Sequence, residues 1–312
     1  MVCRPGGRIP RLRPCLALLV GVLAAACTAG SGEPTTTEAQ SPPATASTVA
    51  PMPSTSTSTT TSTTTSTTTF TPSTLDPETP LPIEPVVRVP DGDGPFPVVV
   101  LVHGGSWVGG STGIMAPLAR YLADEGYLTI NTNYTLGGNR PGFPDAMNDV
   151  ACAVRLGRTH PEGDGTVTLV GHSAGAHIAA VVALTGNIYT ERCPIAASGL
   201  PDRLIGLSGP YDIDRLGFVL YPFLGGGPGV EPEAWEAANP HLHVEENPDI
   251  ETLLLLHGDR DGLVEIGFAF AFDQALRDAG SESLVEIVEG ANHTDTLDPT
   301  IVGGLIVTWL ER

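Results

Sequence analysis

Lysine is absent from this chain of 312 residues, so arginine supplies all 15 of its permanently positive side chains. Aspartate and glutamate together number 35, which gives a formal net charge of −20. A surface this acidic repels the phosphate backbone of DNA and RNA. We therefore expect no nucleic-acid partner.

The N-terminal region lacks an apolar run long enough to cross a bilayer, since Leu16–Ala26 has only about half the length that a transmembrane helix needs. Four arginines precede this run and small residues end it, which is the pattern of a signal peptide over residues 1–26. The end of the run resembles the lipobox of bacterial lipoproteins, in which Cys27 would become the lipidated first residue. Ala24 departs from that pattern, because a larger aliphatic residue is more usual there. We expect an exported cell-surface lipoprotein whose lipid binds the membrane, with a plain secreted protein as the alternative.

Large apolar side chains are scarce from residue 27 to residue 79, where Thr, Ser, Pro, Ala and Gly dominate and Ser54–Thr69 is unbroken serine and threonine. Such a segment cannot bury enough apolar surface to offset the entropy lost on ordering. The composition predicts a disordered tether. Residues 80–312 are then left for one folded domain of ordinary size.

Cysteine is also scarce, with five in the chain, of which three lie in the signal region. The remaining pair, Cys152 and Cys193, lies in the predicted domain. In an exported protein these two could form a disulfide, which we favour. The alternative is that both are small buried apolar residues.

Short apolar runs alternate with longer helical patterns after residue 80, which is typical of a mostly parallel sheet with helices on both faces. Val98–Val102 is continuously aliphatic, as a strand buried on both faces should be. The other predicted strands are Leu128–Thr132, Val167–Val170, Leu204–Leu207, Leu253–Leu256 and Leu284–Val288. The predicted helices are Pro144–Thr159, Ala174–Thr185, Phe268–Ala279 and Pro299–Leu310.

A Gly-x-Ser-x-Gly string at residues 171–175 has Ser173 at its centre, between a predicted strand and a predicted helix. In a chain this rich in glycine the string alone is weak, but its place at a strand-to-helix turn is that of a nucleophile elbow. Glycines on either side remove Cβ atoms that would clash there. The similar string around Ser208 ends in proline with no clear helix behind it, so we interpret Ser208 as the end of a strand.

A glycine-rich turn, His103–Trp107, follows the strand Val98–Val102 directly. Backbone N–H groups in such a turn can bind a developing oxyanion, because no side chain blocks their approach. Gly105, with Gly104 or Ser106, is therefore a candidate donor. The N–H of Ala174, next to the nucleophile, is the second.

An acid and a base must follow the serine along the chain. Asp259 and Asp261 both lie directly after the strand Leu253–Leu256 and are candidates for the acid. His293 is the only histidine after the last predicted strand, which makes it the candidate base. Two other histidines, His172 and His177, lie in the elbow and its helix, where packing or a local hydrogen bond suits them.

A second group of histidines, His241 and His243, lies near Glu245 and Glu246. Their spacing matches no strong metal-ligand pattern. We therefore expect neither a metal nor a cofactor.

Together these residues resemble the α/β-hydrolase superfamily, and more narrowly the esterase group that includes bacterial carboxylesterases, acyl-peptide-hydrolase-like proteins and kynurenine formamidases. The resemblance covers about Ile83–Arg312 and implies an α/β-hydrolase fold and cofactor-free hydrolysis of carboxylic esters or amides. It assigns the acid to Asp261 rather than Asp259. Ser106 stands where relatives of hormone-sensitive lipase have a third glycine, which argues against that branch. The motifs that carry it are His103–Trp107, Asn133-Tyr134, Pro144–Asp149, the Ser173 elbow, Ser208–Asp212, Leu224–Gly226, Asn239-Pro240, His257–Asp261 and His293.

We thus expect a serine carboxylic-ester hydrolase that forms an acyl-enzyme and acts on small or polymer-borne esters. An aryl formamidase uses the same three residues and is the main alternative, since the Gly-Gly-x-Trp107 pattern favours it weakly. A non-catalytic binding module on the same scaffold is a further alternative. The segment Asp212–Pro240, rich in glycine and proline, could form a short lid.

Overall fold

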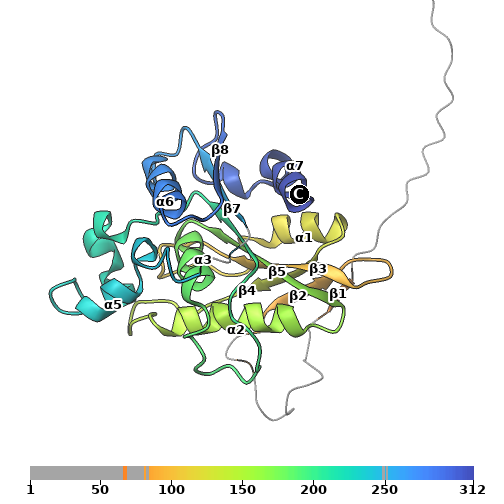
Figure 1. The fold of residues 1–312 in the computed structure, drawn as a ribbon, viewed down its shortest axis with the longest axis horizontal. Helices are drawn as coiled ribbons and strands as arrows, with labels where there is room; N and C mark the ends of the chain where they lie inside the picture. Colours follow the sequence, from red (N-terminus) through yellow and green to blue (C-terminus); the bar gives the residue numbers. More distant parts are fainter. Residues whose placement is uncertain (1–65, 69–80, 82–83, 248–249, 251) are drawn as a thin grey trace, which may run out of the picture. The chain divides into compact units, whose positions relative to one another are not determined.

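A computed structural model describes residues 66–68, 81, 84–247, 250 and 252–312 (Figure 1). The predicted signal peptide, the lipidation candidate Cys27 and nearly all of the predicted tether lie outside the described residues. Within those ranges, none of the helices has both the length and the apolar character that a membrane span requires.

One sheet of eight strands runs through the described chain in the order β1-β2-β4-β3-β5-β6-β7-β8. Every neighbouring pair from β4 to β8 is parallel, and only the pairs β1–β2 and β2–β4 are antiparallel. The predicted α/β-hydrolase fold with a mostly parallel sheet is confirmed. The strands are β1 Ser66–Thr68, β2 Val86–Val89, β3 Phe96–Val102, β4 Leu128–Thr132, β5 Gly163–His172, β6 Arg203–Leu207, β7 Thr252–Gly258 and β8 Ser283–Val288.

The antiparallel edge of the sheet differs from the sequence-based expectation. Strand β2 was not predicted, because four residues give too short an alternation to distinguish from a loop. Strand β1 consists of three residues from the segment that we predicted as a tether. It pairs with β2, with Ser66 opposite Val89. An unpaired strand edge is a ready template for such an addition.

Helices cover both faces of the sheet, as predicted, and Figure 1 shows α2 on one side of the strands and α1 with α7 on the other. Side chains of α2, α3 and α6 belong to one buried cluster, and those of α1 and α7 belong to a second. Among the longer helices that cover the sheet, α1 was not predicted, although its buried Leu118 and Leu122 are four residues apart, as one helix face requires. The helices are α1 Ala116–Asp124, α2 Asp145–Thr159, α3 Ala174–Thr185, α6 Gly267–Asp278 and α7 Pro299–Leu310.

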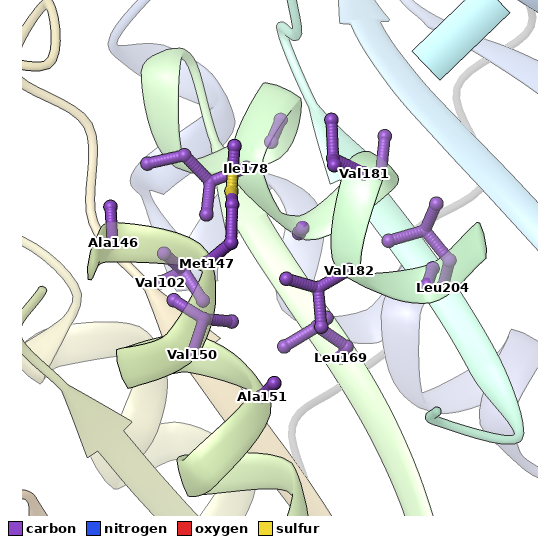
Figure 2. Close-up of a cluster of buried hydrophobic side chains, with 14 of the residues drawn as sticks. Val102, Ala146, Met147, Val150, Ala151, Leu169, Ile178, Val181, Val182 and Leu204 are labelled. Carbon is purple, nitrogen blue, oxygen red and sulfur yellow. The ribbon is translucent and has the colours of Figure 1, made fainter. Parts of the chain in front are cut away.

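The two clusters explain why β3 is aliphatic without interruption. Val98, Val100 and Val102 face the first cluster, while Val99 and Leu101 face the second. In the first cluster, apolar side chains of α2 and α3 meet over the sheet (Figure 2). Each fully buried side chain of this kind contributes roughly 1.5–3 kcal/mol to stability. The central strand β3 is therefore packed on both of its faces.

A disulfide joins Cys152 of α2 to Cys193 in the loop after α3, with 5.4 Å between the two Cα atoms. Arg155, one turn further along α2, holds the same loop by hydrogen bonds. Its guanidinium donates to the carbonyl oxygens of Ala197 at 3.1 Å, Tyr189 at 2.7 Å and Gly186 at 3.2 Å. The loop is thus fixed to α2 twice, once covalently and once by an arginine.

The segment Asp212–Pro240, for which the sequence left a short lid open, contains a series of short helices. Two backbone N–H groups of the loop after β4, those of Gly138 and Gly142, donate to the carbonyls of Pro222 and Phe223 and join this segment to the rest of the domain. The short helices are η1 Ile213–Arg215, η2 Gly217–Leu220, α4 Tyr221–Leu224, α5 Pro232–Ala237 and η3 Pro240–Leu242, with η4 Asp295–Leu297 later in the chain.

Candidate active site

Ser173 lies between β5 and α3. Its backbone has a φ of 53° and a ψ of −122°, a conformation that residues other than glycine rarely adopt. The flanking glycines make this turn possible. A Cβ on Gly171 would overlap the carbonyl oxygen of Gly175, and a Cβ on Gly175 would overlap the carbonyl oxygens of Val102 and His103. The geometry is that of a strained nucleophile elbow, at the carboxyl end of a central strand.

The side chains of Ser173, His293 and Asp261 form one chain of hydrogen bonds. Nε2 of His293 lies 2.9 Å from Oγ of Ser173, and Nδ1 of His293 lies 2.8 Å from Oδ2 of Asp261. A carboxylate can only accept, so Nδ1 carries the proton and Nε2 is free to accept the serine proton. The structure therefore brings together three residues that the sequence places on separate loops after β5, β7 and β8.

Asp261 is held as a buried carboxylate. Its Oδ1 accepts the backbone N–H groups of Leu263 and Val264, both at 2.9 Å, and its Oδ2 lies 3.4 Å from Nε2 of the buried His257. Burial alone would raise the pKa of Asp261, but the hydrogen bonds from Val264, His293 and Leu263 outweigh it and lower that pKa. The acid is thus ionised where it meets the imidazole.

Asp259, the other candidate acid, has a different partner. Its Oδ1 accepts the backbone N–H of Gly290 at 2.6 Å, which joins the loop after β7 to the loop after β8. Asp261, not Asp259, is the carboxylate hydrogen-bonded to His293.

Two side chains hold the backbone carbonyl of His293, and a third side chain supports one of them. The carbonyl of His293 lies 3.0 Å from Nε2 of His172 and accepts a hydrogen bond from Oγ1 of Thr296 at 3.1 Å. Oγ of Ser208 lies 3.1 Å from the Thr296 hydroxyl. Burial lowers the pKa of His172 to about 4, so this imidazole is neutral and donates through Nε2. In the sequence, His172 stood out only by its position inside the elbow, and nothing indicated a role for Thr296.

Ser208 lies directly after β6, where we expected the end of a strand. Its side chain is buried and its φ is 49°. It does not contact the imidazole of His293 by any hydrogen bond found in the described chain.

The glycine-rich turn after β3 lies against the elbow. A Cβ on Gly104 would lie 2.8 Å from Nδ1 of His172 and 3.1 Å from Cβ of Ser173. Gly105 has a φ of 133°, which a side chain would disfavour, and Ser106 has a φ of 50°. Ala174 is the first residue of α3, where backbone N–H groups have no partner within the helix. The four predicted oxyanion residues therefore lie on two neighbouring turns around Ser173, the candidate nucleophile.

The remaining candidate histidines have local partners. Nε2 of His243 lies 3.2 Å from the carbonyl oxygen of Glu236, and the ring of His241 packs near Phe272. Among the residues that the structure describes, no cluster of three or more potential metal ligands is found.

The parallel sheet and the serine at its elbow place this chain in the α/β-hydrolase class. A more specific assignment comes from the family model of BD-FAE, which matches residues 87–276, more than half of the chain. The chain belongs to the BD-FAE family. The matched range contains Ser173 and Asp261 but ends before His293.

Curated proteins with similar sequences are named as esterases. The esterase LipC of Mycobacterium tuberculosis is 31% identical over 67% of this chain and 56% of its own length. The esterase LipQ of the same organism is 28% identical over 66% of this chain and 52% of its own length. The chain thus spans about half the length of the curated relatives it matches. A thermophilic esterase of Thermogutta terrifontis, solved with bound butyrate, shares the fold with a TM-score of 0.60 at 21% identity, over 73% of this chain and 88% of that one.

Proposed function

We propose that this chain is a hydrolase of carboxylic esters that uses Ser173, His293 and Asp261 as a catalytic triad. The observation that carries the proposal is the continuous hydrogen-bonded chain Oγ–Nε2 and Nδ1–Oδ2, at 2.9 and 2.8 Å, on a strained elbow. The names of the curated relatives, both esterases, support the same chemistry.

In the proposed mechanism, Nε2 of His293 takes the proton of Ser173 as Oγ attacks the ester carbonyl. Asp261 keeps the imidazole in the required tautomer and stabilises its charged form. The oxyanion would accept hydrogen bonds from Ala174 N–H and from Gly105 with Gly104 or Ser106. The imidazolium then protonates the leaving alcohol, and water releases the acyl group from Ser173 by the same route.

The substrate class that we propose is small or polymer-borne esters. The test compares p-nitrophenyl acetate and p-nitrophenyl butyrate with N-formylkynurenine as substrates of the purified chain. A clear preference for the formamide would replace the ester proposal by that of an aryl formamidase. Turnover of none of the three would leave a binding module as the better interpretation.

Ser173→Ala tests the nucleophile directly. We expect ester turnover to fall by about four orders of magnitude, while circular dichroism and the melting temperature stay close to those of the wild type. Mass spectrometry after an acid quench should find the acyl group on the peptide that contains Ser173 in the wild type only. Activity within tenfold of the wild type would refute this assignment.

We also propose that the enzyme is exported and anchored by a lipid on Cys27, on the basis of the N-terminal pattern alone. The native protein should then partition into detergent with the membrane fraction, and Cys27→Ala should abolish this partition without changing activity. Wild-type protein found entirely in the culture fluid would refute the anchor.

A further inference from the structure

Trp107 follows the candidate oxyanion donors directly and is buried, with 3% of its surface exposed. Its backbone φ is 63°, and that of Ser106 before it is 50°. Two consecutive residues with side chains in the left-handed region are unfavourable, so contacts elsewhere must hold this turn. The carbonyl of Trp107 accepts the N–H of Gly137 at 2.8 Å, which fixes one side of it.

The indole of Trp107 supplies the second attachment. Its Nε1 donates to Nδ1 of His177 at 3.0 Å, and Nε2 of His177 lies 2.8 Å from the carbonyl oxygen of Ala238. Since an indole N–H only donates and a carbonyl only accepts, both contacts are satisfied by a neutral imidazole that is protonated on Nε2. Complete burial lowers the pKa of His177 to about 4, in agreement with this neutral form.

His177 belongs to the helix that begins at the nucleophile. It lies four residues after Ser173, and its backbone N–H donates to the carbonyl of Ser173 at 3.2 Å. One rigid helix therefore carries the nucleophile, the Ala174 donor and the acceptor for the Trp107 indole. The Trp107–His177 bond spans the two turns that carry the oxyanion donors.

We propose that Trp107 is a positioning residue that, through His177, sets the Gly105 and Ser106 N–H groups against the Ala174 N–H so that all converge on the substrate oxyanion. This role rests on the proposed ester hydrolysis. It predicts that the indole N–H matters in the transition state rather than in ground-state binding of the ester. A loss of kcat with little change in KM is the corresponding signature.

Trp107→Phe removes the N–H and keeps most of the buried ring. We expect kcat for p-nitrophenyl acetate to fall by about 10- to 100-fold, because a small displacement of oxyanion donors is costly, with KM within about threefold of the wild type. Trp235→Phe is the matched control. Trp235 is also buried, at 5% exposed, and its Nε1 also donates one hydrogen bond, to the carbonyl of Gly226 at 2.9 Å. The kcat of Trp235→Phe should stay within about threefold of the wild-type value.

A second variant separates positioning from general loss of packing. His177→Phe removes the acceptor of the Trp107 hydrogen bond. Both substitutions break this same bond, so the kcat of Trp107→Phe/His177→Phe should be no lower than that of the slower single variant. Losses that multiply in the double variant, or equal losses in Trp107→Phe and Trp235→Phe, would overturn the proposal.

A measurement without substrate keeps the test independent of the proposed function. In amide NMR spectra, Trp107→Phe should shift the resonances of Gly105, Ser106 and Ala174, and Trp235→Phe should leave them in place. If the wild type turned over no ester, the ester proposal would fail while these shifts still reported the link. Unchanged resonances in Trp107→Phe would overturn the positioning role even in an active esterase.

Discussion

Asp259 and Asp261 are separated by one residue, yet their carboxylates have different partners. Asp261 accepts from His293 and two backbone N–H groups, whereas Asp259 accepts from Gly290. We expect Asp261→Asn to lower kcat by about 10⁴-fold, because an amide no longer fixes the imidazole tautomer. Asp259→Asn should lower kcat by at most about tenfold. Ester turnover of the two purified variants decides between them, and equal losses would show that the acid is misassigned.

At the level of single residues, the sequence indicates the proposed catalytic residues better than the side chains that support them. Ser173 and His293 follow predicted strands on loops that a parallel sheet must bring to one edge. Asp261 could be chosen over Asp259 only through the family resemblance. The bond from His172 to the His293 carbonyl and the bond between Ser208 and Thr296 each join residues far apart in the sequence, and no spacing rule encodes such pairs. These roles emerge only when the ends of β5 and β6 and the loop after β8 are folded together.

At the scale of secondary-structure elements, the close approach of α3 to β3 depends on the absence of a side chain at Gly175. A Cβ on Gly175 would overlap two carbonyl oxygens at the end of β3, and neither can move without disturbing a central strand. Gly175→Ala should therefore lower ester turnover by at least about 100-fold and destabilise the domain by about 1–3 kcal/mol. Denaturant unfolding and initial rates measure the two effects.

Gly304→Ala is the matched control for this substitution. Gly304 lies on the exposed side of α7, where a new Cβ would contact nothing within 4 Å. Alanine there should leave activity unchanged and stabilise the domain by about 0.5–1 kcal/mol. A Gly175→Ala enzyme as active and stable as this control would contradict the close approach of α3 to β3.

The elements that the sequence predicted well are those with long, uniform patterns. Strand β3 is apolar throughout, and the fully buried helix α3 is apolar except for His177 and Thr185, so the sequence alone indicates both elements. The short helices between β6 and β7 lack such a pattern, because glycine and proline set their bounds and tertiary contacts complete them. Strand β1 belongs to the same category, since a run of serine and threonine carries no signal for pairing with β2.

For the molecule as a whole, buried neutral histidines predict acid sensitivity. Burial lowers the pKa of both His172 and His177 to about 4. An unfolded chain would protonate these imidazoles below about pH 6.5, so it binds more protons than the folded chain between about pH 6.5 and 4. The free energy of unfolding should therefore fall as the pH is lowered through this window, by up to about 3 kcal/mol for each histidine.

His177→Gln removes one of these two contributions. The difference between its unfolding free energies at about pH 7 and about pH 4.5 should be smaller than that of the wild type by about 2 kcal/mol. Urea unfolding followed by tryptophan fluorescence at both pH values gives this difference. An identical pH dependence in the two proteins would mean that His177 titrates normally in the folded state.

The double attachment of the loop after α3 bears on how the protein can be produced. Without the disulfide, three carbonyl oxygens of that loop would still accept hydrogen bonds from the guanidinium of Arg155. Cys152→Ser/Cys193→Ser should then lose about 3–4 kcal/mol of stability, as expected for a closed loop with a separation of 41 residues, yet keep ester turnover within about twofold. Aggregated or inactive double variant would show that the arginine alone does not hold the loop. A host with a reducing cytoplasm should accordingly yield folded, active enzyme, so that the proposed export would determine where the enzyme works rather than whether it can fold.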